Sequence, residues 1–118
     1  MVHHDAALPG GEVLSAMTRA DLASAMPDCP DLSEVVALAR ELGAGLYADI
    51  KDEAAALPAL GLLQEAAIRP VIIGAFNTAI VDSLKAAGST YPVAALVPIG
   101  ADPHAHAAEA DVIHLCWE

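Results

Sequence analysis

The chain has 118 residues, enough for one domain or part of one, and 56% of them are hydrophobic while only 18% are charged. This share of charge is low for a small free-standing domain with a large surface to cover, and it suggests a chain that packs against neighbours. The formal net charge is −11 with five Lys and Arg residues, which excludes a basic stripe that follows nucleic-acid phosphates, and no apolar run reaches the roughly 18 residues of a membrane span.

Helix and strand signals alternate along most of the chain. In chain order we expect the end of a strand at residues 1–3, a loop at 5–13, helices at 17–26 and 31–42, a strand at 46–50, a helix at 54–67, a strand at 69–76, a helix at 77–88, a strand at 91–98, a short helix or loop at 102–110 and a last strand at 111–117. Thr18, Asp31 and Asn77 are the expected helix N-caps. Pro58 is tolerable if it lies in the first turn of its helix.

The expected strands are apolar without polar alternation, which is typical of strands buried on both faces of a parallel sheet. Helices and such strands in alternation predict βα units around a parallel sheet, in a doubly wound fold or a barrel. In both architectures functional residues lie at the carboxyl ends of the strands. Those positions hold His4, Asp49, Lys51, Phe76 and Trp117. Their repeated placement predicts the rim of an active site.

A carboxylate at a strand end can ligate a hard divalent cation such as Ca²⁺ or Mg²⁺. Lys51 lies two residues after Asp49 and therefore points to the same face of the strand, where it can hold an anionic oxygen that the cation also touches. His4 can move a proton near neutral pH. Together these groups suit phosphoester hydrolysis.

Plainer interpretations stay open for each residue. Asp49 and Lys51 also fit a simple salt bridge at the end of the sheet. His4 also fits a solvated terminal histidine, and Trp117 also fits a core residue. From the remaining histidines near the C-terminal end we expect no metal site, because no carboxylate spacing there matches a known ligand pattern. These are His104, His106 and His114.

The two cysteines, Cys29 and Cys116, are far apart and form no CxxC motif. We expect buried, reduced thiols and neither a disulfide nor a metal site. No signal peptide is visible at the start of the sequence, so we expect a cytoplasmic location by default.

Five segments, in this order and at these separations, resemble the glycerophosphodiester phosphodiesterase family. They are VHHDAAL at 2–8, similar to the family's strand ending in His-Asp; GEVLSAMTRADLAS at 11–24, similar to its G-x-V and T-x-x-E-L segment; CPDLSEVVALAR at 29–40, similar to its I-P-T-L-E-E-V-L helix; LYADIKD at 46–52, similar to its E-I-K strand; and VIIGAF at 71–76, similar to its V-I-I-S-S-F strand. They lie between residues 2 and 76 of the 118. The resemblance implies a partial (β/α)₈ TIM barrel of about five parallel strands with flanking helices.

Enzymes of that family hydrolyse glycerophosphodiesters to an alcohol and glycerol 3-phosphate with a divalent cation. The resemblance implies that His4 is one of two acid/base histidines and that Asp5 supports it. Asp49 stands where the family usually has a metal-ligating Glu, and Lys51 matches the lysine beside the phosphate. Phe76 is then expected at the substrate. Trp117, at another strand end, is expected there too.

The chain departs from the family pattern in ways that bear on activity. The family's first strand, with His-Arg, and its second, with Glu-x-Asp, have no counterpart here, and neither has its closing strand. By this alignment the chain is a single, incomplete domain over residues 1–118 that holds strands three to seven of eight. Asp49 in place of Glu also shortens the ligand arm by one methylene. We therefore expect weak or no activity from this chain alone.

Two alternatives from other classes stay open. The chain could be a non-catalytic α/β module that binds a phosphorylated small molecule or completes a barrel by oligomerisation, because an open arc of strands leaves two edges unpaired. It could instead be an enzyme that forms a Schiff base through Lys51, although a lysine beside a carboxylate stays protonated and is a poor nucleophile.

Overall fold

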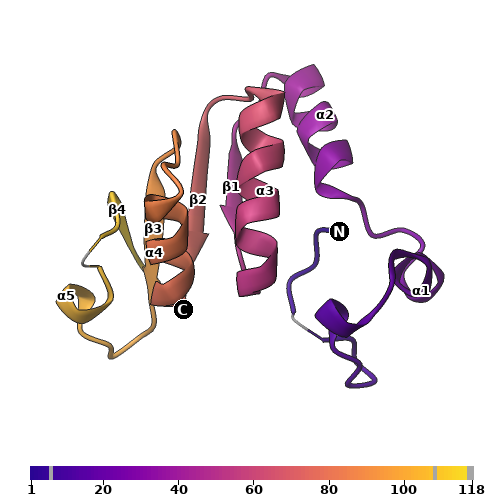
Figure 1. Cartoon of the computed structure of the whole chain (residues 1–118), viewed down its shortest axis with the longest axis horizontal. Coiled ribbons are helices and arrows are strands. Elements are labelled where there is room, and N and C mark those ends of the chain that lie inside the picture. Colours follow the sequence, from indigo (N-terminus) through magenta and orange to yellow (C-terminus); the bar gives the residue numbers. More distant parts are fainter. Residues whose placement is uncertain (6, 108, 117–118) are drawn as a thin grey trace.

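The structure, a computed structural model, describes residues 1–5, 7–107 and 109–116. Its helices are the 3₁₀ turn η1 (Leu14–Ala16), α1 (Arg19–Ala25), α2 (Leu32–Leu42), α3 (Glu53–Ala66), α4 (Thr78–Ala86) and α5 (Pro103–His106), and its strands are β1 (Leu46–Asp49), β2 (Val71–Ala75), β3 (Val93–Val97) and β4 (Val112–Leu115). The N-terminal segment with α1 lies at one end of the molecule, and β4 with α5 lies at the other (Figure 1). No helix in the described part of the chain is long and apolar enough to cross a membrane.

The strands form one parallel sheet in the order β1-β2-β3-β4. This confirms the predicted α/β class with helices beside a parallel sheet. The sheet has four strands in the described residues, one fewer than the expected five, because residues 1–3 form no strand. The backbone N–H of Val2 donates to the carbonyl of Pro30 in the loop before α2, so this segment pairs with a loop and not with β1.

The helix boundaries follow from capping chemistry. Thr18 and Asp31 each begin a helix with a capping box, and Asn77 caps α4 through its side chain, as the sequence predicts. Gly43 ends α2 in the left-handed conformation. One expectation is wrong: α3 begins at Glu53, so Pro58 lies inside the helix and not in its first turn.

The two faces of the sheet are different. We call convex the face that packs on the helices and concave the opposite face. The convex face carries Leu46, Ala48, Ile50, Val71, Ile73, Ala75, Val93, Ala95, Val97, Ile113 and Leu115, and the concave face carries Tyr47, Asp49, Ile72, Gly74, Ala94, Leu96, Val112 and His114.

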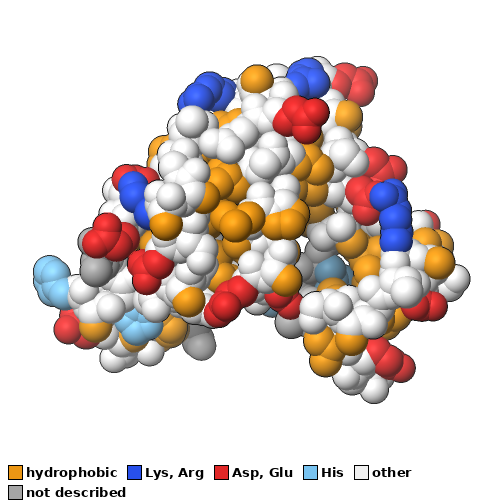
Figure 2. Space-filling view, viewed as in Figure 1, with side chains coloured by type: hydrophobic (Ala, Val, Ile, Leu, Met, Phe, Trp, Pro, Cys, Tyr) orange, Lys and Arg blue, Asp and Glu red, His pale blue; other side chains and the backbone are white. Residues whose placement is uncertain are grey.

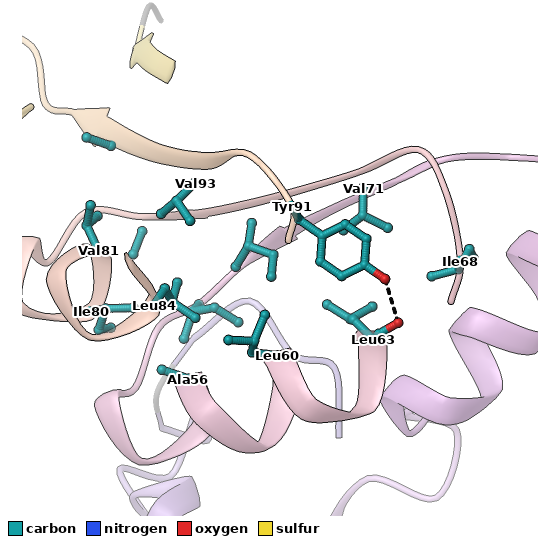
Figure 3. Packing of buried hydrophobic residues seen from close by; sticks show 14 of the residues in the cluster. Ala56, Leu60, Leu63, Ile68, Val71, Ile80, Val81, Leu84, Tyr91 and Val93 are labelled. Carbon is teal, nitrogen blue, oxygen red and sulfur yellow. Dashed lines mark hydrogen bonds between the residues drawn. The ribbon is translucent and has the colours of Figure 1, made fainter. Parts of the chain in front are cut away.

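The hydrophobic core lies between the convex face and helices α3 and α4 (Figure 3). Leu63, Ile73 and Leu84 are fully buried there. The hydroxyl of Tyr91 donates a 2.6 Å hydrogen bond to the carbonyl of Leu63, so the polar end of this buried ring is satisfied.

The convex face is uncovered at β4. Ile113 and Leu115 point to that face with 46% and 58% of their surface exposed. At the other end of the molecule, α2 exposes Leu38 and Leu42. Arg40 of α2 donates to the carbonyl of Ala66 in α3, so these two leucines lie on the flank of α2 that faces away from α3. Both ends of the α/β layer therefore present apolar surface.

Candidate functional site

The site is built around the end of β1, where Asp49 and Lys51 point to the same face, as their spacing predicts. Lys51 Nζ lies 2.5 Å from Asp49 Oδ2. The Lys51 side chain is 26% exposed and the Asp49 side chain is 29% exposed. The second carboxylate oxygen, Asp49 Oδ1, is buried and accepts no hydrogen bond from the described residues. A buried acceptor without a partner is uncommon in folded proteins and marks a position where a further donor or cation fits.

Phe76 follows β2 and joins this pair. Lys51 Nζ lies 5.1 Å from the centre of the Phe76 ring, which is within the range of a cation–π contact. Phe76 is itself exposed. The structure therefore brings together three of the residues that the sequence places at strand ends: Asp49, Lys51 and Phe76.

A cleft of about 470 Å³ separates the N-terminal segment from β1. His3 and Asp5 line it from one side, and Asp49 and Lys51 line it from the other. The molecule is visibly notched between the N-terminal part and its main body, with acidic side chains spread over both (Figure 2). The cleft is the place where a small anionic ligand can meet Lys51.

The structure places His4 beside this cleft and not in its lining. The His4 side chain is 85% exposed, and its Nδ1 lies 2.8 Å from Asp5 Oδ1. That hydrogen bond, together with the charge of His4, holds the pKa of Asp5 below its usual value, and the charge of Lys51 adds a smaller contribution in the same direction. The role of His4 stays a prediction.

Tyr47 and His114 are two residues that the sequence reasoning did not assign to the site. Tyr47 precedes Asp49 by two positions and also lines the cleft. Its hydroxyl lies 3.1 Å from His114 Nδ1. Burial, and then the charge of Asp49, raise the pKa of Tyr47. The alternation of Tyr47, Asp49 and Lys51 along one strand was the signal that could have identified the first of these residues.

Among the described residues, the others considered from the sequence add no group to this site. Trp117 lies outside the described residues. Within residues 1–5, 7–107 and 109–116, no group of three or more His, Cys, Asp or Glu side chains is arranged to hold a metal ion. His104 and His106 lie on α5. Cys29 and Cys116 are free thiols, but both are of intermediate exposure and not buried as expected.

Searches of protein-family models and of curated proteins with this sequence found no match.

Proposed function

We propose that the chain is part of a phosphodiester-hydrolysing domain of the glycerophosphodiester phosphodiesterase type, with its reaction centre at the carboxyl end of β1. The resemblance of five sequence segments suggests the reaction. The observation that carries the proposal is the Asp49 carboxylate, which has one oxygen on Lys51 and the other buried without a partner. A purely structural salt bridge at a sheet edge does not explain why one carboxylate oxygen is buried without a hydrogen-bond partner.

The residues present fit a divalent cation in part. Asp49 Oδ1 is a hard oxygen ligand of the kind that Ca²⁺ and Mg²⁺ take. A single carboxylate leaves most of the coordination to water, to phosphate oxygens or to further polypeptide. A bound cation would supply charge stabilisation for the phosphoryl group in the transition state.

The chain's own residues have distinct roles in this proposal. Lys51 binds a phosphoryl oxygen and stabilises the negative charge that develops on it. Phe76 lies beside the Lys51 ammonium and limits the directions in which that group can move. Water attacks phosphorus and releases its proton to solvent, and His4 gives a proton to the leaving alcohol oxygen as the bond of that oxygen to phosphorus breaks. Asp5 holds the His4 ring through their hydrogen bond.

Hydrolysis of glycerophosphocholine in Ca²⁺ or Mg²⁺, with calorimetric titration of the cation, tests the proposal. We expect turnover by the isolated chain far below the roughly 1–10³ s⁻¹ typical of enzymes, and weak cation binding that Asp49→Ala abolishes. The matched control is Asp82→Ala, an exposed carboxylate on α4, which should keep the binding. Cation binding that survives Asp49→Ala would overturn the proposed role of Asp49. Turnover in the normal enzyme range would overturn the expectation of an incomplete site.

A second function is favoured by the exposed apolar ends of the sheet. In this alternative the chain is a non-catalytic module, and two copies complete a barrel by pairing β4 of one copy with β1 of the other. Helix α2 of the second copy, with Leu38 and Leu42, would then cover Ile113 and Leu115. Eight strands would result from two sheets of four. Sedimentation analysis tests this: a monomer at all concentrations counts against it, and a dimer that Leu115→Asp dissociates supports it.

A further inference from the structure

One contact on the concave face joins the two outermost strands of the sheet. The Tyr47 hydroxyl on β1 lies 3.1 Å from His114 Nδ1 on β4, and the two rings meet edge to face with centroids 5.5 Å apart. Strands at either end of a four-stranded sheet are about 14 Å apart along the sheet at about 4.8 Å per step. Two side chains that meet across this span require the sheet to curve toward them.

The missing side chain at Gly74 leaves room for this contact. A Cβ on Gly74 of β2 would lie 2.5 Å from the Tyr47 hydroxyl oxygen and 2.6 Å from a methyl carbon of Leu96 on β3. Only a residue without a side chain lets the Tyr47 ring lie over β2 with its hydroxyl above Gly74. The position of the Tyr47 hydroxyl thus depends on Gly74 and Leu96 as well as on His114.

The sheet register places His114 level with the site. Asp49 pairs with Gly74, and Gly74 pairs with Ala94. Two residues further along each strand this row becomes Lys51, Phe76 and Leu96, and Leu96 pairs with His114. His114 therefore lies in the same transverse row as Lys51, on the same concave face.

We propose that His114 is a binding residue for the phosphoryl group of the ligand that Lys51 holds, and that Tyr47 is its positioning residue. This inference rests on the proposed function. A tyrosine hydroxyl that donates to Nδ1 leaves the proton of the neutral imidazole on Nε2. Nε2 makes no hydrogen bond with the described residues. In that tautomer Nε2 is a free donor in the same row and on the same face of the sheet as Lys51.

The arrangement suits an oxyanion held from two sides. Lys51 is a flexible point charge that already contacts Asp49. It can therefore attract an anionic ligand, but it does not set the orientation of that ligand. An imidazole held by a second strand adds a directional hydrogen bond. Tyr47 lies two residues before Asp49 on the same face of β1 and lines the cleft, so its ring would limit how deep a ligand can enter.

The test is titration of the chain with sn-glycerol 3-phosphate in Ca²⁺, followed by the ring resonances of ¹⁵N-labelled histidine and by calorimetry. We expect the Nε2 resonance of His114 to shift on binding. His114→Ala should lower the affinity about tenfold or more, the effect of one hydrogen bond to a charged group, and added imidazole should restore part of it. Tyr47→Phe should lower it less and move the Nδ1 resonance of His114 even without ligand.

The control variant is His104→Ala, which removes an exposed imidazole from α5 and should leave the affinity unchanged. Thermal unfolding of each variant shows whether it is folded. If the wild type binds and His114→Ala binds equally well, the inference about His114 is wrong and the proposed function stands. If the wild type does not bind glycerol 3-phosphate at all, the proposed function fails and this inference fails with it.

Discussion

On the convex face, the side chains that β2 and β3 direct toward the helices are all apolar and buried, whereas the concave face presents a carboxylate, a phenol and an imidazole to a cleft and to solvent. The first face holds the molecule together, and the second holds groups that can do chemistry. A sheet with such a division allows one face to be altered with little effect on the other. Variants can therefore separate stability from function.

The largest effect is expected in the middle of the convex side. Leu63→Ala removes a fully buried side chain of α3 and should lower the free energy of unfolding by about 2–5 kcal/mol. Leu57→Ala is the matched control, because it makes the same change on the same helix at a side chain that is 52% exposed; its effect should stay within about 0.5 kcal/mol. Urea denaturation measures both. Equal effects would contradict the assignment of the core to this face.

A smaller loss is expected from Tyr91→Phe. This change keeps the buried ring and removes only the hydroxyl that donates to the Leu63 carbonyl. It leaves that carbonyl without its side-chain partner, so the free energy of unfolding should fall by about 1–2 kcal/mol. The midpoint of urea denaturation reports the loss, and an unchanged midpoint would mean that water replaces the hydroxyl.

Asp111, just before β4, makes a pH-dependent contribution. It accepts hydrogen bonds from Lys85 at 2.5 Å and from the backbone N–H of Val93 at 2.9 Å, and these lower its pKa in the folded state. A lowered pKa stabilises the fold above the unfolded-state value of 3.8, and this stability is lost as the pH falls through the folded-state pKa.

Asp111→Asn should therefore cost no more than about 1 kcal/mol at pH 7, because the Asp111 side chain is 42% exposed and solvent screens its ion pair. The cost should disappear once the wild-type carboxyl is protonated. The measurement is the difference in unfolding free energy between wild type and variant from pH 7 to pH 3. A difference that stays constant over this range would show that charge on Asp111 does not matter.

The smallest effect on stability is expected on the concave face. Asp49→Asn breaks a partly exposed ion pair, and such pairs contribute about 0–1 kcal/mol. The unfolding free energy should change by no more than that, while cation binding is lost. A loss as large as that of Leu63→Ala would mean that Asp49 is a structural residue, and it would remove the basis of the proposed function.

The sequence was a good guide to the elements because apolar, β-branched runs and capping residues are local signals. The strands predicted at 46–50 and 69–76 and the helix that begins after Asp31 depend on such signals, and the structure has them at Leu46–Asp49, Val71–Ala75 and Leu32–Leu42. Residues 1–3 carry an equally plausible signal, but a strand needs a partner with matching edge groups, and the Val2 N–H is taken by Pro30.

The site was predictable only where it follows strand alternation. Asp49, Lys51 and Phe76 come together because parallel strands end at the same edge of the sheet. The contact between Tyr47 and His114 depends on how strongly the sheet curves and on the missing side chain at Gly74. Neither is visible in a window of neighbouring residues, since the two partners are 67 positions apart.

The bare convex surface of β4 also has a consequence for the behaviour of the chain in solution. In the described part of the chain β4 is an edge strand with one side free. With Ile113 and Leu115 exposed, such an edge is a template on which further chains can assemble. At a net charge of −11, mutual repulsion opposes that assembly. Salt weakens the repulsion, because the screening length falls from about 30 Å at 0.01 M to about 8 Å at 0.15 M. The colloidal stability of the chain should therefore decline as ionic strength rises, even while its fold stays intact.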